Sequence, residues 1–346
     1  MKAETKRMIK KIKSIQFDKM NRIIDIISKE NNKSKLYIRI DLFKNFLKRG
    51  IGYTDYFRGN YINLTEEEKD TFVTAKSFYR VVHSLNNYDY IGIFHNKLVF
   101  DEFFRKYLKR DFINIKKATK REYTNFLKKH NVFFAKDPLG EGGHGVKKIK
   151  LDEVQDTAML YNELIKNKQF LLEEEIIQSE ELNEINPNVV NSFRVITLVN
   201  NGQSFVLANA LRVNQDNSNV IGCTNDLYFS FAEDGTINSN VIDDFGNIYE
   251  KHPLTEKKFS EVRVPDVKEA FEICKKAALE IPEVRYIGWD VAFSNKGPVI
   301  VEGNEYPGYG IIQFYKLTNK RTGHLKEIQD VLGNDLKWSK KGFVNA

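Results

Sequence analysis

The second half of the chain alternates short apolar runs with turns that contain glycine. Runs rich in β-branched and aromatic residues predict strands. These runs cover residues 132–137, 169–177, 192–199, 204–213, 288–293 and 298–303. Residues 266–281 instead place apolar side chains at three- and four-residue steps, which predicts a helix. Strands that cluster around isolated helices favour an α+β fold over a regular doubly wound sheet.

The N-terminal 36 residues predict a basic amphipathic helix. Its apolar positions recur mostly at three- and four-residue steps: Met8, Ile9, Ile12, Ile15, Met20, Ile23, Ile24 and Ile27. Residues 1–35 hold 11 Lys and Arg against 4 Asp and Glu, which accounts for the whole net charge of +7. Two interpretations stay open. The helix packs on the body with its lysines in solvent, or it lies on an anionic membrane surface.

Composition excludes several classes of protein. The chain of 346 residues has two cysteines, Cys223 and Cys274, too few for a disulfide scaffold, so a reduced, cytoplasmic setting is expected. No apolar run reaches the roughly 20 residues of a membrane span. After residue 35 the chain carries 43 residues of each sign and no recognisable nucleic-acid motif, which argues against a nucleic-acid partner. The segment NNKSK at 31–35 marks the expected break, and Thr65 is a predicted helix cap.

A glycine-rich loop follows a predicted strand that ends at Lys136. Asp137 and Pro138 break the strand, and glycines stand at positions 140, 142, 143 and 145. Without Cβ atoms, such a loop can turn its N–H groups toward a phosphate. It matches neither a Walker A loop nor a Rossmann fingerprint, so by itself it is weak evidence for a nucleotide.

The segment FLLEEEIIQSEEL contains adjacent carboxylates within a predicted strand. Burying all of them would be costly. We therefore expect a solvated edge strand with Glu173 and Glu175 pointing outward. Glu174 then lies on the opposite face and needs a partner.

A predicted hairpin brings three oxygen donors together. The strands of RYIGWDVAF and GPVIVEGN are joined by the turn SNKG, which places Asp290 near Glu302 and Asn304 on one face. Carboxylates this close repel each other unless a positive charge lies between them. Hard oxygen donors suit Mg²⁺, which commonly shares its ligand shell with substrate phosphates.

Together these segments resemble the ATP-grasp superfamily, and most closely its sugar-transfer-associated branch from surface-polysaccharide biosynthesis. The resemblance is carried by the segments NPNVVNSFRVITLV, YIGWDVAF, PVIVEGNEYPG and YTDYFRGNYINLTEEEKDTF. The resemblance covers roughly residues 37–320. It implies an α+β fold in which two subdomains grip ATP. The expected units are the helix at 1–36, an N-terminal region at 37–130, the ATP-grasp domain at 131–320 and a C-terminal helix or tail at 321–346.

The resemblance also implies roles for individual residues. Lys97 and Lys136 reach the nucleotide phosphates, and Arg194 and Arg212, with Lys136, neutralise the transferring phosphoryl group. The remaining positions are the lid glycines Gly142, Gly143 and Gly145, the hinge carboxylate Glu174, the adenine-contacting backbone of Glu175 and Ile176, the ribose-binding Glu181, and the magnesium ligands Asp290, Glu302 and Asn304. The acceptor region near 219–230 keeps only Gly222 where relatives often have a glycine pair.

The implied function is an ATP- and Mg²⁺-dependent ligase that works through an acyl phosphate. Its substrates are a small-molecule carboxylate and an amine or sugar acceptor, and its setting is the modification of a surface glycan. Two alternatives stay open: a kinase-like phosphotransferase, and a non-catalytic ATP-binding scaffold of a polysaccharide assembly complex. Residues 1–35 provide a candidate peripheral contact with the inner membrane surface.

Overall fold

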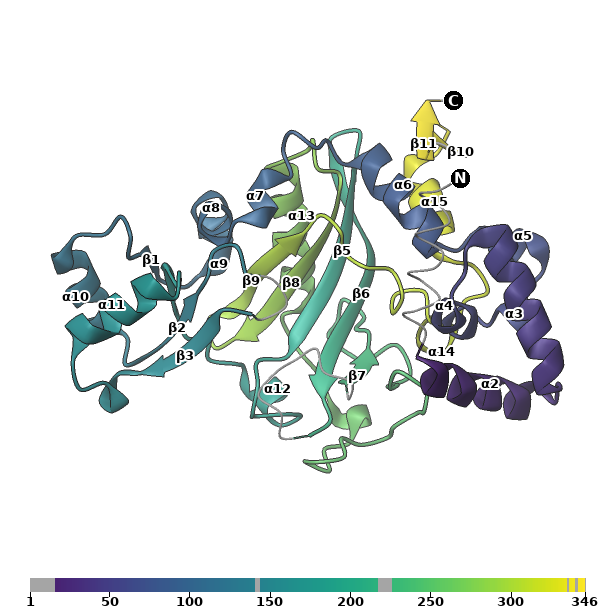
Figure 1. Ribbon diagram of the computed structural model, residues 1–346, viewed down its shortest axis with the longest axis horizontal. Coiled ribbons are helices and arrows are strands. Elements are labelled where there is room, and N and C mark those ends of the chain that lie inside the picture. The colour runs from purple at the N-terminus through teal and green to yellow at the C-terminus, as the bar shows by residue number, and fades with distance from the viewer. Residues whose placement is uncertain (1–15, 141–143, 217–225, 335, 340–341, 346) are drawn as a thin grey trace.

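The computed structural model describes residues 16–140, 144–216, 226–334, 336–339 and 342–345. Its centre is a five-stranded, fully antiparallel sheet with the order β7-β6-β5-β8-β9 (Figure 1). The strands are β5 (Ser192–Asn200), β6 (Gln203–Asn214), β7 (Asp226–Phe229), β8 (Tyr286–Ser294) and β9 (Gly297–Asn304). The expected strands at 192–199, 204–213, 288–293 and 298–303 therefore form one sheet, and β7 joins it at the edge.

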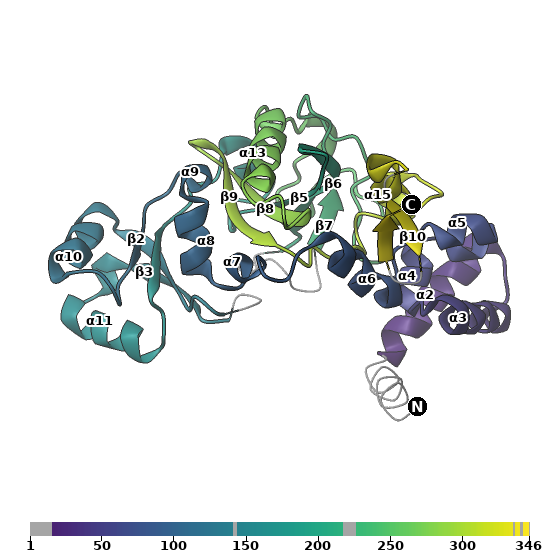
Figure 2. The same ribbon diagram turned by 90° about the horizontal axis from the view of Figure 1, so that it is seen from above.

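Helix α13 (Val267–Leu279) covers one face of this sheet (Figure 2). It occupies most of the segment in which the apolar periodicity predicts a helix. Phe271 of α13 packs against Phe193 of β5, with ring centroids 5.9 Å apart. Because side chains alternate along a strand, Ser192 and Arg194 point to the other face. The charged residues of the hairpin lie on that second face.

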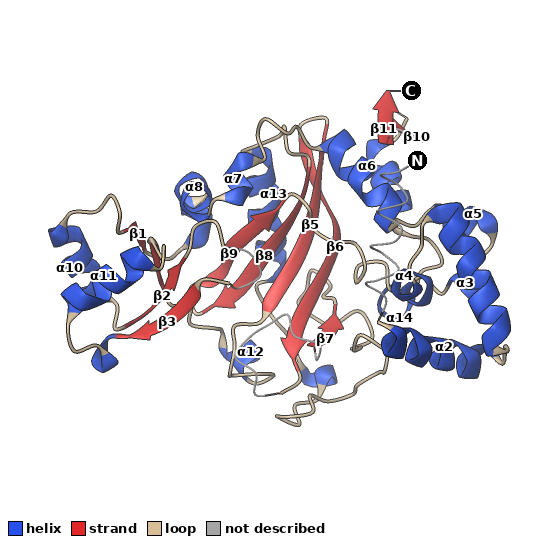
Figure 3. Cartoon of the chain, viewed as in Figure 1, coloured by secondary structure: helices blue, strands red, loops and turns tan. Residues whose placement is uncertain are grey.

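A smaller sheet lies to the left of the large sheet in Figure 3. Its order is β1-β4-β2-β3, built from β1 (Phe112–Asn114), β2 (Val132–Lys136), β3 (Val146–Lys150) and β4 (Leu171–Glu174). Helices α10 (Lys120–Lys129) and α11 (Thr157–Lys166) cover one face of it. Phe133, Ala135 and Leu172 point into this helix-covered core. Lys136 and Glu173 consequently belong to the opposite face.

Two connections join the sheets. Short helices α7 (Gly92–His95), α8 (Lys97–Phe103) and α9 (Arg105–Leu108) precede β1 and lie near β9 (Figure 1). The hinge after β4 runs along the end of β8, where Ser179 N donates to Phe293 O at 2.8 Å and Asn295 N donates to Ile177 O at 2.9 Å. The hinge is thereby fixed to the tip of the β8–β9 hairpin.

The N-terminal region is helical and packs beside the large sheet. It contains α2 (Phe17–Asn31), α3 (Lys35–Arg49), α4 (Tyr53–Arg58), α5 (Glu66–Asp70), α6 (Ala75–Leu85) and a 3₁₀ turn at Tyr61–Asn63. Two further 3₁₀ turns, at Leu151–Glu153 and Phe259–Glu261, lie in other parts of the chain. Thr65 caps α5 in a capping box, as its sequence predicts. Asn32, in the left-handed region at φ 50°, ends α2 within the expected break.

The isoleucines of α2 lie in the protein core. Ile23, Ile24 and Ile27 are buried and share a cluster with Ile38 of α3 and Phe314 near the C-terminus. For these three residues the packing interpretation of the basic helix holds. Residues Met8 to Ile15 of the expected helix lie outside the described residues. No helix among the described residues is long and apolar enough to cross a bilayer.

The end of the chain returns to the N-terminal helices. Here lie α14 (Tyr315–Thr318), α15 (His324–Leu332), β10 (Leu336–Ser339) and β11 (Gly342–Asn345), whereas the short α12 (Glu180–Asn183) belongs to the hinge after β4. β10 and β11 form a hairpin that the sequence does not predict. Trp338 of β10 receives the guanidinium of Arg80 from α6 over its ring at 5.2 Å.

Candidate active site

A row of charged residues crosses three strands of the large sheet. Arg194 on β5 is the register partner of Asp290 on β8, and Asp290 is the partner of Glu302 on β9. Arg194 binds Asp290 with two hydrogen bonds, from Nε at 2.6 Å and from Nη2 at 2.9 Å. The pairing confirms that the hairpin places the two carboxylates on one face.

Asn304 completes the oxygen-donor cluster, since its Nδ2 donates to Asp290 Oδ2 at 3.3 Å. Burial raises the pKa of Glu302, and the neighbouring Asp290 charge raises it further. Lys97 and Asn304 act in the opposite direction without cancelling this effect. Burial and the neighbouring Asp290 thus disfavour the charged form of Glu302, and a bound cation would favour it.

Gly288 lets the chain after β9 close over this row. A Cβ at this position would lie 2.4 Å from Pro307 Cβ, so only glycine fits. The close approach allows Arg194 Nη1 to donate to Pro307 O at 2.7 Å. The arginine is thus held both by Asp290 and by the backbone of the EYPG segment.

The two lysines expected at the phosphates approach from the small-sheet side. Lys97 begins α8, its Nζ donates to the carbonyl of Gly140, and its charge acts on Glu302. Lys136 ends β2 and forms an ion pair with Glu173 of β4. The lysines therefore border the region between the glycine loop and the carboxylate row.

Glu173 is the centre of a buried ionic cluster, which corrects the expectation that it points outward. Arg110, which is also buried, donates to Glu173 Oε1 from Nη2 at 2.7 Å. Burial alone would raise the pKa of Glu173, but the charges of Arg110 and Lys136 hold it well below its usual range. The predicted alternation of side chains along β4 is correct, but the prediction of which face is exposed to solvent is wrong.

Asp101 of α8 joins the same cluster. Its carboxylate lies 3.7 Å from Arg110 Nη2 and is buried. Burial, followed by repulsion from Glu173, raises the pKa of Asp101 to about 8. Arg110 also donates to the carbonyl of Ile300 on β9 at 2.8 Å. The cluster thus connects α8, both sheets and the strand that carries Glu302.

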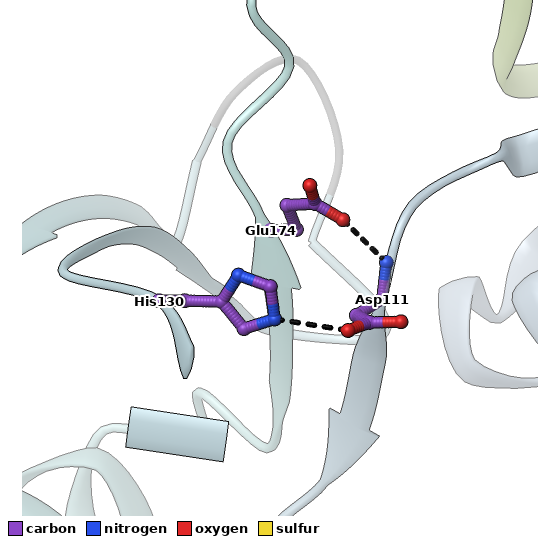
Figure 4. A group of neighbouring side chains, drawn as sticks. All are labelled: Asp111, His130 and Glu174. Atoms are coloured by element: carbon purple, nitrogen blue, oxygen red, sulfur yellow. Dashed lines mark hydrogen bonds and ion pairs between the residues drawn. The ribbon is translucent and has the colours of Figure 1, made fainter. Parts of the chain in front are cut away.

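Glu174 points to the opposite face of β4, toward Asp111 and His130 (Figure 4). Glu174 Oε2 accepts from Asp111 N at 2.9 Å, and His130 Nε2 lies 3.0 Å from Asp111 Oδ2. The donor atoms lie within 4.8 Å of one another, yet both carboxylates already pair with lysines, Lys296 and Lys129. We interpret this group as a salt-bridge cluster that ties the small sheet to the hairpin tip. The hydrogen-bond and ion-pair partners of Glu174 therefore lie on the face of the small sheet opposite Lys136.

The glycine loop is described at its two ends only. Asp137 N donates to Gly145 O at 3.1 Å, which closes the loop like a hairpin. Gly145 has φ +77°, and a Cβ there would lie 2.9 Å from Asp137 Cβ. Gly142 and Gly143 lie outside the described residues, as do positions 219–225 of the acceptor region.

The hinge borders a small cavity of about 70 Å³. Glu175 and Ile176 line it, and their contact with adenine stays a prediction. Glu175 also pairs with Lys148 of β3 at 2.6 Å. Glu181 is half-buried on α12, two residues beyond the point where Ser179 joins β8. The complete lining is Leu108, Lys109, Arg110, Glu174, Glu175, Ile176, Ile177, Ser294, Asn295, Lys296 and Val299.

Arg212 extends the charged face toward β7. It is the register partner of Ser192, which places it on the same face as Arg194. Its guanidinium pairs with the buried Asp226 and lies 5.8 Å from the ring centroid of Tyr228. Both expected arginines therefore line the face that bears Asp290 and Glu302.

Sequence reasoning missed Arg110, Asp101 and the inward position of Glu173. Arg110 lies in a KRD segment that resembles many exposed basic turns. A usable signal was present for Asp101, because it stands four residues after Lys97 and shares its helix face. Glu173 gives no such signal, because its partners come from β2 and from the segment before β1.

One family model matches the chain. The model of the family described as sugar-transfer associated ATP-grasp matches residues 78–329. No curated protein matches the chain.

Similar solved structures include the biotin carboxylase domain of Hydrogenobacter thermophilus 2-oxoglutarate carboxylase, with 15% identity, TM-score 0.45 and coverage of 74% of this chain and 49% of that one. D-alanyl-alanine synthetase A from Vibrio cholerae has 12% identity, TM-score 0.39 and coverage of 69% and 64%. N5-carboxyaminoimidazole synthetase from Staphylococcus aureus, complexed with ADP, has 14% identity, TM-score 0.43 and coverage of 68% and 54%. This chain thus spans about half to two thirds of these proteins.

The family match covers most of the chain. It includes both sheets, the hinge, the two lysines and the full row of charged residues. The chain therefore belongs to the sugar-transfer associated ATP-grasp family.

Proposed function

We propose that this protein is an ATP- and Mg²⁺-dependent ligase that activates a carboxylate as an acyl phosphate and joins it to an amine or hydroxyl. The observation that carries the proposal is the cross-strand row of Arg194, Asp290 and Glu302, with Lys97 acting on its last member. In a member of the ATP-grasp family, this combination of cations and carboxylates suits a nucleoside triphosphate with its metal.

The residues present fit Mg²⁺. Asp290, Glu302 and Asn304 offer hard oxygen donors on adjacent strands, and Glu302 is buried beside a second carboxylate, whose charge adds to the effect of burial in raising its pKa. These three residues would hold the metal. When bound, Mg²⁺ neutralises phosphate charge and orients the phosphoryl group for transfer.

The cationic side chains stabilise the first step, in which a carboxylate oxygen of the substrate attacks the γ-phosphorus of ATP. The bond from that phosphorus to the β,γ-bridging oxygen breaks, and ADP leaves. Lys97 and Lys136 lie beside the glycine loop and are placed to bind phosphate oxygens. Arg194 and Arg212 share the face on which negative charge develops.

The second step uses the good leaving group made in the first. The acceptor nitrogen or oxygen attacks the carbonyl carbon, inorganic phosphate leaves, and the acceptor gives up a proton. The chain has to hold both substrates in line and exclude water, and no covalent enzyme intermediate is required. The family description, which names sugar transfer, supports a sugar or glycan as the modified substrate, and we propose that this glycan belongs to a surface polysaccharide.

The decisive experiment follows oxygen from the carboxylate. Candidate carboxylates are paired with amines and amino sugars, and pairs are selected by ADP release in the presence of Mg²⁺. The active carboxylate is then labelled with ¹⁸O. A ligase transfers one labelled oxygen to inorganic phosphate. A kinase-like reaction leaves the phosphoryl group on the product and releases no labelled phosphate, which would overturn the proposal. ATP binding without turnover of any substrate pair would favour a scaffold.

A further inference from the structure

Helix α3 carries a row of apolar side chains on its outer surface. Leu36, Ile40, Phe43 and Leu47 are separated by four, three and four residues, so they lie on one face of the helix. Their exposed fractions are 68%, 47%, 60% and 59%. The opposite face packs on the body through Ile38, which is fully buried. We refer to the four exposed residues as the α3 stripe.

The α3 stripe is remote from the candidate active site. Figures 1 and 2 both place α3 at the end of the molecule opposite the small sheet. Single exposed apolar residues are common on soluble proteins, but a continuous row along three helical turns marks an interaction surface. These side chains are too far from the candidate active site to contact its substrates, so their exposure indicates a binding partner.

Cations border the α3 stripe on both sides. At 100° per residue, Lys44 lies on one flank beside Tyr37, and Arg39 lies on the other. Lys33, just before the helix, places its ammonium 5.8 Å from the Tyr37 ring centroid. None of these three cations forms an ion pair with a residue that the structure describes. Asp41 is the acidic residue of α3, and it is turned inward, where it accepts a 2.6 Å hydrogen bond from Tyr56.

We infer that the α3 stripe binds the surface of an anionic phospholipid bilayer, with the axis of α3 parallel to the membrane plane. Leucine, isoleucine and phenylalanine enter the acyl boundary, while the flanking lysines and arginine reach lipid phosphates. Tyr37 suits the same boundary, since its ring is apolar and its hydroxyl is polar. This surface differs from the α2 isoleucines, which are buried.

Charge decides between a bilayer and other occupants. A second copy docked through the same stripe would bring Arg39 and Lys44 of both copies together, and their charges would repel. Residues 1–15 hold six basic residues against one acidic residue, so they would also be repelled from these flanks. An anionic surface attracts both the flanks and the basic N-terminal residues. The inference does not depend on the reaction catalysed.

The test uses the full-length protein and two kinds of vesicle, one of phosphatidylcholine alone and one with roughly one third phosphatidylglycerol. Co-sedimentation at low and high salt gives the partition coefficient. The stripe variant carries Leu36→Gln, Phe43→Gln and Leu47→Gln. Its matched control carries Met159→Gln, Ile248→Gln and Leu279→Gln, at apolar residues that are exposed elsewhere. A third variant carries Lys33→Gln, Arg39→Gln and Lys44→Gln. Circular dichroism checks that each variant is folded.

We expect salt-sensitive binding to the anionic vesicles only. The stripe variant should bind at least about tenfold more weakly, because it lacks three apolar side chains that would be buried in the acyl boundary of the bilayer. The control should bind like the wild type. The third variant should lose mainly the salt-sensitive part. Absence of wild-type binding at low salt would overturn the inference. So would equal binding by the stripe variant, which would assign the contact to residues 1–15. A wild-type dimer that the stripe variant converts to a monomer, without vesicle binding, would identify a second copy as the occupant.

Discussion

Lys136 and Glu173 are diagonal neighbours on adjacent strands, and their side chains form an ion pair on the face of the small sheet opposite α10 and α11. Lys136 is the lysine expected to bind phosphate. Glu173 holds it in place and is itself held by the buried Arg110. Lys136 is therefore already oriented in the ligand-free protein, which would reduce the entropy lost if it binds phosphate.

The cluster around Glu173 should make a strongly non-additive contribution to stability. Glu173→Leu should destabilise the protein by about 3 kcal/mol, because the buried Arg110 loses its hydrogen-bonded partner and keeps only Asp101, 3.7 Å away, as a carboxylate neighbour. The double variant Glu173→Leu with Arg110→Met should recover part of this loss, since neither charge remains. Urea denaturation of the four proteins in the cycle measures the coupling. Additive losses would show that the pair contributes no mutual stabilisation.

Asp101 should make stability depend on pH between about 4 and 8. Its pKa in the folded protein, about 8, lies above the value of the unfolded chain. The folded state therefore binds a proton that the unfolded state releases. This stabilisation is complete below about pH 4 and is lost as the pH rises toward 8, by about 1 kcal/mol per pH unit. Asp101→Asn cannot titrate, so its stability relative to the wild type should increase from pH 5 to pH 8. A constant difference between the two unfolding curves would contradict the assignment.

Glu302→Gln should remove the dependence of ATP binding on magnesium. The substitution keeps the size of the side chain but deletes one of two adjacent carboxylates, so the metal loses a charged ligand. Turnover should fall below detection. Calorimetric titration with ATP, with and without Mg²⁺, makes the comparison. Glu283→Gln, at an exposed carboxylate outside the sheet, is the control and should keep the wild-type response. An unchanged magnesium effect in Glu302→Gln would remove Glu302 from the metal site.

Gly145→Ala should weaken ATP binding as well as stability. Its backbone lies at φ +77°, where alanine costs about 1 kcal/mol, and its Cβ would collide with Asp137. Gly202→Ala provides the control, because Gly202 has φ +73° but open space around the Cβ. Both variants should unfold at lower urea, and only Gly145→Ala should lose ATP affinity. Equal ATP affinity in the two variants would show that the loop closure at Asp137 does not contribute to nucleotide binding.

The hairpin at the site could be predicted from sequence because its information is local. Two apolar runs joined by a short turn predict an antiparallel hairpin, whereas the pairing of Asp290 with Glu302 also depends on a shift in register between Asp290 and Val291 that the spacing does not show. The strand at 132–136 and the helix at 267–279 follow from periodicity for the same reason. Family resemblance then supplied the roles that spacing alone does not give.

Only the tertiary structure decided which face each element buries. Alternation shows that Glu173 and Glu174 point to opposite sides, but the burial of Glu173 depends on Arg110, which lies 63 residues earlier in the chain. Periodicity likewise predicts the amphipathic α2, while the apolar stripe of α3 is exposed because its other face, with Ile38, packs on the body. A sequence pattern specifies the relative directions of side chains along one element. The burial of those side chains is set by other elements, and only the folded chain brings those together.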